Sequence, residues 1–177
     1  MRCTECTDGF CPFLPENAKS TVKCKKCGNE SSIVVSDVLE LWQKMESCDS
    51  SEKDMDKLQR LYDKCEKVFS PYNVALCRLA ETIMGLALAM ENYAIAAKYT
   101  EKTFICFSTF YPRLHPALTV RTYEYSKMLM LDRKYECLQF LQQAFQMMCD
   151  SYGPESDFAA ETEKILNDVL HPDPSHE

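Results

Sequence analysis

Two pairs of cysteines with the same spacing lie near the beginning of the sequence. Cys3 and Cys6 form one Cys-x-x-Cys pair, and Cys24 and Cys27 form a second. Tetrahedral zinc needs four soft or borderline ligands, and two such pairs supply them with little backbone strain. The distance between the pairs along the chain falls in the range expected for four-cysteine zinc sites. The spacing therefore predicts a structural zinc ion; the alternative is a disordered leader with free thiols.

The residues around these pairs refine the prediction. Lys23, Lys25 and Lys26 flank the second pair, and their positive charge is expected to favour thiolates. Cys11 is left over, and it either replaces one of the four ligands or belongs to a second site completed by another segment. No histidine lies nearby, so a catalytic zinc with an open position is not expected. The remaining cysteines fall in helical stretches and are expected to be small buried hydrophobic residues: Cys48, Cys65, Cys77, Cys106, Cys137 and Cys149.

Composition limits the classes of protein that the chain can represent. With 177 residues, 46% hydrophobic and 27% charged, it fits one soluble domain with a small appendage. The net charge of -7 argues against direct binding of nucleic acid and would suit basic peptides, although solvated helix faces explain it more simply. No stretch is long and apolar enough for a membrane span, and the first residues form no apolar signal region.

The cysteine count bears on the compartment. Eleven cysteines cannot all pair, which favours metal ligands and buried thiols over a disulfide framework. Together with the missing signal region, this predicts an intracellular protein, cytoplasmic or nuclear or both.

The elements that must position these residues are predominantly helical. Only four glycines occur, and the turn formers of the first 32 residues, such as Gly9 and Gly28, give way to helical periodicity. A cap at Ser36-Asp37 is expected to open the first helix, and Ser50 or Ser51 the second. Seven helices are predicted at about 37–48, 52–69, 74–88, 93–110, 117–131, 134–152 and 156–170. The expected organisation is a cysteine-rich segment at 1–35, a helical domain at 36–170 and a polar tail at 171–177.

The helical region contains an internal repeat with a shift of 42 residues. Asn92-Tyr93 lies over Lys134-Tyr135, and Phe110-Tyr111-Pro112 lies over Tyr152-Gly153-Pro154. Each unit is a helix, a short turn, a second helix that opens with an aromatic residue, and a loop with proline. Antiparallel pairs of this kind bury their apolar faces by stacking on their neighbours. The pattern predicts a mainly α, tetratricopeptide-like α-α superhelix, with a plain helix bundle as the alternative.

Motifs of known catalytic chemistry are absent from the sequence. It has no Gly-rich phosphate loop and no His-Glu-x-x-His motif. None of the three histidines, His115, His171 and His176, is paired by its position with a serine or cysteine nucleophile. No catalytic or cofactor-binding residue is therefore predicted, and the chain alone is expected to be inactive.

In their order along the chain, these features resemble the C-terminal part of a SET and MYND domain (SMYD-type) protein-lysine methyltransferase. In that family a post-SET segment, Cys-x-Cys-x-x-Cys, is followed directly by a tetratricopeptide-like helical domain. Cys3 and Cys6 match the last two of these cysteines. The repeat helices and loops of the family are matched by the stretches Tyr72-Asn73-Val74 to Met90-Glu91-Asn92-Tyr93, Phe110-Tyr111-Pro112 and Met147 to Tyr152-Gly153-Pro154.

The resemblance implies a role and also shows departures. Met1 stands where the family has its first cysteine, so the chain could start inside a longer parent protein. The family's zinc uses a ligand from the SET core, and here Cys24 and Cys27 would substitute. The S-adenosylmethionine pocket, the catalytic Asn-His motif and the MYND finger have no counterpart, so S-adenosylmethionine would bind only in a longer parent.

Two main functions are consistent with these observations. The resemblance implies a region that forms one wall of a methyltransferase substrate cleft and binds protein or peptide partners, with lysine-rich ones suited to its acidic charge. The second hypothesis is a free-standing tetratricopeptide-like adaptor with a structural zinc site. A third, an independent zinc finger for nucleic acid, is disfavoured by the net acidity.

Overall fold

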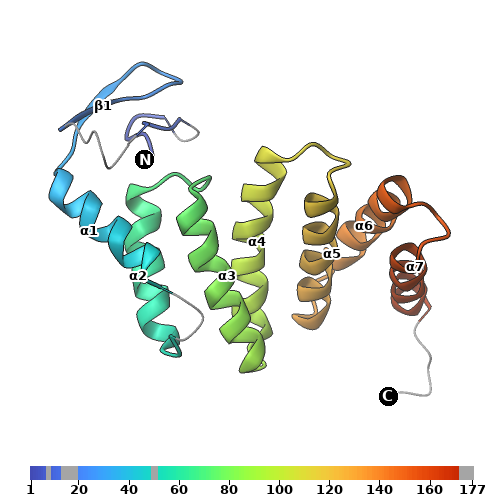
Figure 1. Ribbon diagram of the computed structural model, residues 1–177. Coiled ribbons are helices and arrows are strands. Elements are labelled where there is room, and N and C mark those ends of the chain that lie inside the picture. Colours follow the sequence, from blue (N-terminus) through green and yellow to red (C-terminus); the bar gives the residue numbers. More distant parts are fainter. Residues whose placement is uncertain (7–8, 13–19, 49–51, 172–177) are drawn as a thin grey trace. The chain divides into compact units, whose positions relative to one another are not determined.

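The fold is taken from a computed structural model that describes residues 1–6, 9–12, 20–48 and 52–171. These residues form one two-stranded sheet and seven helices (Figure 1): β1 (Thr21–Lys23), β2 (Glu30–Ser32), α1 (Val35–Glu46), α2 (Met55–Val68), α3 (Val74–Ala89), α4 (Tyr93–Phe110), α5 (Pro116–Leu131), α6 (Cys137–Tyr152) and α7 (Asp157–Leu170). The predicted mainly α fold with about seven helices is confirmed. The chain divides into two compact units, Met1–Leu86 and Ala87–Glu177.

The first unit contains a hairpin that the sequence did not predict. β1 and β2 pair in antiparallel register, with Val22 opposite Ser31 and Lys23 opposite Glu30. Gly28 has a φ of 74° in the connection, a left-handed conformation that suits glycine. Each strand has only three residues, which is too short for an alternating pattern to stand out. The hairpin holds the Cys24–Cys27 pair at its turn.

The starts of α1 and α2 differ from the predicted caps. Val34 occupies the N-cap position of α1 without a side-chain hydrogen bond, so the predicted cap at Ser36-Asp37 is wrong; Asp37 lies in the first turn. There its charge still interacts favourably with the positive end of the helix dipole. Asp54 caps α2, accepting a hydrogen bond of 2.9 Å from the Lys57 amide. The predicted caps Ser50 and Ser51 lie outside the described residues.

In the second unit, α4, α5, α6 and α7 succeed one another as packed neighbours (Figure 1). Their core mixes apolar side chains with threonines that are fully buried, among them Thr100, Thr103 and Thr122. Each of these hydroxyls donates to a carbonyl of its own helix, as Thr100 does to Ala96 at 2.7 Å. A buried hydroxyl with a partner avoids the cost of an unpaired polar group, and its small size lets helices approach closely.

The predicted repeat is visible in the backbone of two helix reversals. Glu91 and Arg133, 42 positions apart, have φ values of 56° and 57°. The Asn92 amide donates to the Ala87 carbonyl at 2.9 Å, and the Lys134 amide donates to the Leu129 carbonyl at 2.8 Å. In both reversals, the helix therefore ends with a residue of left-handed conformation at the equivalent position and with a 6→1 hydrogen bond.

The two reversals lead into their next helices differently. The Asn92 side chain caps α4 by accepting from the Ile95 amide, whereas Lys134 cannot accept such a bond. As a result α6 begins at Cys137, three residues after the predicted start at Lys134. Tyr135 precedes α6 and is 97% exposed, whereas Tyr93 is the first residue of α4. The predicted tail at 171–177 lies, apart from His171, outside the described residues. Of the helices described, none has the length and apolarity to cross a membrane.

Candidate metal centre

The four cysteines predicted as zinc ligands lie together. The sulfur atoms of Cys3, Cys6, Cys24 and Cys27 all lie within 4.8 Å of one another. The Sγ atoms of Cys3 and Cys27 are 3.6 Å apart, and those of Cys6 and Cys24 are 3.7 Å apart. Tetrahedral zinc with bonds of about 2.3 Å requires sulfur separations of about 3.8 Å. The cluster therefore has the donor type, the number and nearly the spacing that a zinc ion needs, and it could hold one.

Each pair is shaped by the same local backbone. The Glu5 amide donates to the Sγ of Cys3 at 3.4 Å, and the Lys26 amide donates to the Sγ of Cys24, also at 3.4 Å. In both cases the residue two positions after the first cysteine turns its N–H back toward the sulfur. The two Cys-x-x-Cys pairs are thus two copies of one turn that face each other.

Backbone hydrogen bonds bring the two turns together. The Cys3 amide donates to the Gly9 carbonyl, and the Lys25 amide donates to the Phe10 carbonyl at 3.0 Å. Arg2 and Phe10 form an isolated antiparallel bridge. The chain thus returns from the first turn and then passes beside the second turn.

Gly9 forms part of the wall around the sulfur cluster. A Cβ atom at this position would lie 2.4 Å from the Sγ of Cys6 and 2.5 Å from that of Cys24. These distances are far below van der Waals contact, so any side chain would displace the sulfurs. In the sequence Gly9 stands out only as a turn former, because its proximity to both sulfurs depends on the folded arrangement of the two pairs.

The pKa values of the cysteines show that the cluster does not favour four thiolates by itself. Hydrogen bonds from the backbone amides of Cys27 and Lys26 lower the pKa of Cys24 to about 6. Amides of Cys6 and Glu5 likewise lower the pKa of Cys3, whereas burial raises the pKa of Cys6 to about 12. Although the Asn29 amide favours its thiolate, burial and the sulfurs of Cys24 and Cys3 leave the pKa of Cys27 raised.

Each close sulfur pair therefore joins one cysteine with a lowered pKa to one with a raised pKa. Crowded sulfurs share protons in this way because four adjacent negative charges repel one another. A divalent cation at the centre would remove that conflict and allow all four to ionise. The amides, and not the flanking lysines proposed from the sequence, are the largest contributors to the lowered values; Lys23 instead lies 3.8 Å from Glu30 across the hairpin.

Cys11 lies outside the four-sulfur cluster. It is fully buried and packs with Cys3, Val22 and Cys24, with Met1 and Ile33 partly covering them. Burial raises its pKa, which keeps the thiol neutral. Cys11 thus serves as a small apolar core residue, and of the two roles left open for it from the sequence, neither is seen among the described residues.

The cysteines on the helices only partly match the prediction of burial. Cys65, Cys77 and Cys106 are buried, whereas Cys48, Cys137 and Cys149 are half-buried. None of these six joins a cluster of metal-ligating residues in the described parts of the chain.

Comparison with known proteins relates the chain distantly to a lysine methyltransferase. No family model matches the chain. Over 107 residues it is 26% identical to N-lysine methyltransferase SMYD2-B of Danio rerio, a match that covers 60% of this chain and 25% of that protein. The chain is therefore distantly similar to a SMYD-type methyltransferase and corresponds to about a quarter of that relative's length.

Proposed function

We propose that this chain is the substrate-cleft and protein-interaction region of a SMYD-type protein-lysine methyltransferase. The observation that carries the proposal is the similarity to the zebrafish N-lysine methyltransferase over 60% of the chain. The order of elements supports it, because a four-cysteine cluster precedes the succession of helices as the resemblance implies. In this proposal, the cysteines hold a structural zinc ion, and S-adenosylmethionine binds only to a SET core elsewhere in a longer parent.

The helical region would then bind the protein or peptide to be methylated. Methyl transfer to lysine requires a lysine-bearing substrate, and the net charge of -7 would attract basic segments. Calorimetric titration of the chain with a lysine-rich peptide and with its charge-reversed counterpart tests this step. We expect tighter binding of the basic peptide; equal affinities would show that charge does not select the partner.

The decisive experiment is to determine the full transcript and assay its product. We expect an open reading frame with a SET core, whose product transfers tritiated methyl groups from S-adenosylmethionine to a lysine-bearing protein. Deleting α4–α7 from that product should raise the KM for the protein substrate and leave binding of S-adenosylmethionine unchanged. A transcript without a SET core, or methyl transfer by the isolated chain, would contradict the proposal.

The alternative is a free-standing tetratricopeptide-like adaptor with the same zinc site. The lack of a matching family model and the identity of 26% to the methyltransferase are consistent with this function. The transcript separates the two functions, because an adaptor needs no SET core. A positive zinc measurement is common to both and does not distinguish them.

A further inference from the structure

A basic pocket lies between α1 and α2 of the first unit, apart from the cysteine cluster. Its cavity volume is about 720 Å³, within the range of about 300–1,000 Å³ that is usual for ligand sites. Four cations line it, Lys44, Lys57, Arg60 and Lys64, whereas Glu52 is the one carboxylate among the described lining residues. This is a local excess of positive charge in a chain whose net charge is -7.

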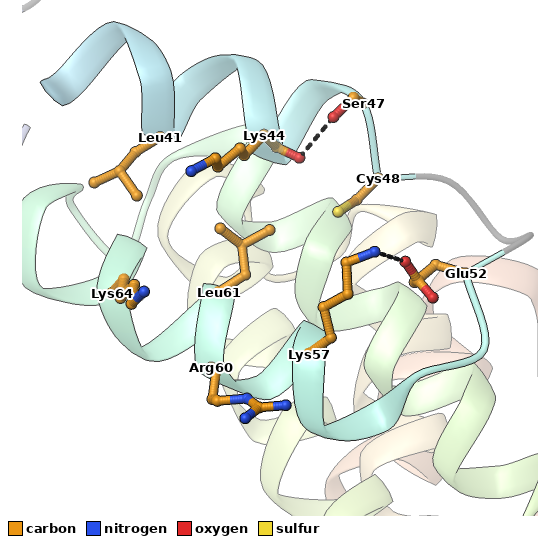
Figure 2. Close-up of a pocket in the computed structure, with 9 residues that line it drawn as sticks. All are labelled: Leu41, Lys44, Ser47, Cys48, Glu52, Lys57, Arg60, Leu61 and Lys64. Atoms are coloured by element: carbon orange, nitrogen blue, oxygen red, sulfur yellow. Dashed lines mark hydrogen bonds and ion pairs between the residues drawn. The ribbon is translucent and has the colours of Figure 1, made fainter. Parts of the chain in front are cut away.

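The cations lie on one face of α2 and on the facing side of α1. Lys57, Arg60 and Lys64 succeed one another at spacings of three and four, which makes them neighbours on the surface of a helix. Lys44 of α1 completes the set, and Leu41 and Leu61 supply apolar surface between the charges. Figure 2 shows Leu41 and Lys44 on the α1 side of the pocket and Leu61 and Lys64 on the α2 side.

Two of the four cations already have carboxylate partners. Lys44 pairs with Glu40, and Lys57 pairs with Glu52, as Figure 2 shows for the latter pair. Arg60 donates through Nε to the Asp56 carbonyl of its own helix. Within the described parts of the chain, no carboxylate lies at ion-pair distance from Arg60 or Lys64. These two residues, one helical turn apart, are the natural partners for an anion that enters the pocket.

From this arrangement we propose that the pocket binds a phosphorylated peptide segment. A phosphate dianion has three acceptor oxygens, so a single group would bind the terminal nitrogens of Arg60 and the amine of Lys64 together once Arg60 turns from the Asp56 carbonyl toward Lys64. An aliphatic side chain next to the phosphorylated residue would pack on Leu41 and Leu61. A long nucleic acid is disfavoured, because its charge would be repelled by the rest of an acidic chain. The proposal does not depend on the methyltransferase assignment.

Binding is tested with a fluorescein-labelled peptide, Gly-Ala-Leu-pSer-Leu-Ala-Gly, measured by fluorescence polarisation with the whole chain. We expect the phosphopeptide to bind at least tenfold more tightly than the same peptide with serine or with glutamate. Its affinity should fall as salt is raised, because the contacts are ionic. Equal affinity for the glutamate peptide would overturn the proposal, since the pocket would then accept any acidic segment.

Matched variants localise the site. The double variant Arg60→Gln with Lys64→Gln should lose at least tenfold in affinity. The control Lys53→Gln with Lys164→Gln removes two exposed cations outside the pocket and should bind as the parent does. Circular dichroism checks that both variants are folded. Equal losses in both would show that net charge, and not this pocket, determines binding.

A second readout uses Cys48, which lines the same pocket. The bound phosphopeptide should slow its alkylation by iodoacetamide, monitored by mass spectrometry of the peptide that contains it. Alkylation of Cys137, which is half-buried in the other unit, should be unaffected. Unchanged modification of Cys48 at saturating phosphopeptide would place the binding elsewhere. Displacement of the peptide by inorganic phosphate at an equal concentration would also overturn the proposal, because the leucine contacts would then contribute nothing.

Discussion

The cysteine segment, residues 1–33, and the helices α4–α7 are stabilised in different ways. Among the described residues of the segment, the buried cluster consists of Cys3, Cys11, Val22 and Cys24, so sulfur makes up most of the core that they form. In α4–α7 the buried residues are instead large apolar side chains and internally bonded threonines, with Tyr99, Leu141 and Met147 among the most fully buried. A segment with so small an apolar core is expected to need a metal, whereas the helices gain their stability from burial.

The largest effect should come from removing a ligand. We expect the wild-type chain to bind one zinc ion and Cys24→Ser to lose it, because structural zinc sites use four protein ligands and the loss of one thiolate weakens binding. Structural zinc sites contribute about 10–16 kcal/mol of binding free energy, which far exceeds what the small core of the segment can supply. Elemental analysis measures the metal, and hydrogen exchange reports the loss of protection in the hairpin of β1 and β2.

The control for this prediction is Cys149→Ser, a half-buried cysteine outside the cluster. It should keep the zinc ion, and α4–α7 should remain protected in both variants. Loss of protection throughout α4–α7 on removal of zinc would break the comparison between the two regions.

The corresponding test in the helical region is Leu141→Ala in α6, which removes an apolar side chain from the core and leaves the cysteines intact. Leu141 is 2% exposed, and emptying its space should destabilise the chain by about 2–5 kcal/mol through lost contacts and a cavity. Denaturant unfolding monitored by circular dichroism measures this change. The zinc content should stay at one per chain; a variant that loses both stability and metal would show that the two regions do not fold independently.

A smaller effect is expected from Gly9→Ala. The new Cβ would collide with the sulfurs of Cys6 and Cys24, so the ligands must move apart and zinc affinity should fall by about 10–100-fold, as for other changes beside metal ligands. Competition with a chromophoric chelator measures the affinity. Gly85→Ala is the matched control, because a Cβ there meets nothing within 4 Å. It should leave zinc affinity unchanged and stabilise α3 by about 1 kcal/mol.

The smallest effect concerns pH and α4–α7. Burial, and then the charges of Glu101 and Glu136, raise the pKa of Tyr125 to about 12. Because the pKa in the folded state exceeds that of the unfolded chain, near 10, the neutral phenol contributes stability fully below pH 10 and loses it as pH rises to about 12. The midpoint of thermal unfolding should therefore fall by a few degrees over this range.

The variant Tyr125→Phe cannot ionise at this position, so its thermal midpoint should fall less between pH 10 and pH 12. Burial also raises the pKa of Cys65 to about 11, and this part of the pH dependence should remain in the variant. Identical pH profiles for the two proteins would show that ionisation of Tyr125 is not linked to unfolding.

Local patterns predicted most of the fold. Ser70-Pro71, Asn92 and Gly153-Pro154 mark helix boundaries in the sequence, and α3, α4 and α5 begin and end within one residue of the predicted bounds. The start of α6 was misplaced because the repeat aligned Lys134 with Asn92, although a lysine cannot accept the capping hydrogen bond. The hairpin was missed because its three-residue strands are mostly polar.

The site was predictable where it depends on spacing and unpredictable where it depends on tertiary packing. The two Cys-x-x-Cys pairs identified the four sulfurs that come together. The place of Gly9 against those sulfurs, the burial of Cys11 and the basic pocket all require segments that meet only in the fold. The spacing of Lys57, Arg60 and Lys64 is visible in the sequence, but only the packing of α1 beside α2 shows that Lys44 and Leu41 complete a pocket with them.

The first residues of the chain are bonded directly to the end of α2. The Arg2 amide donates to the Val68 carbonyl at 2.9 Å, and the Arg2 guanidinium donates to the Glu66 carbonyl. Arg2 directly precedes the ligand Cys3 and satisfies carbonyls in the last turn of α2, where a helix has no partners of its own. Loading of the sulfur cluster would thus be communicated to the end of α2. If zinc were lost and these bonds broke, the last turn of α2 would lose two of its hydrogen-bond partners. The sensitivity of that turn to proteolysis would then depend on the zinc concentration.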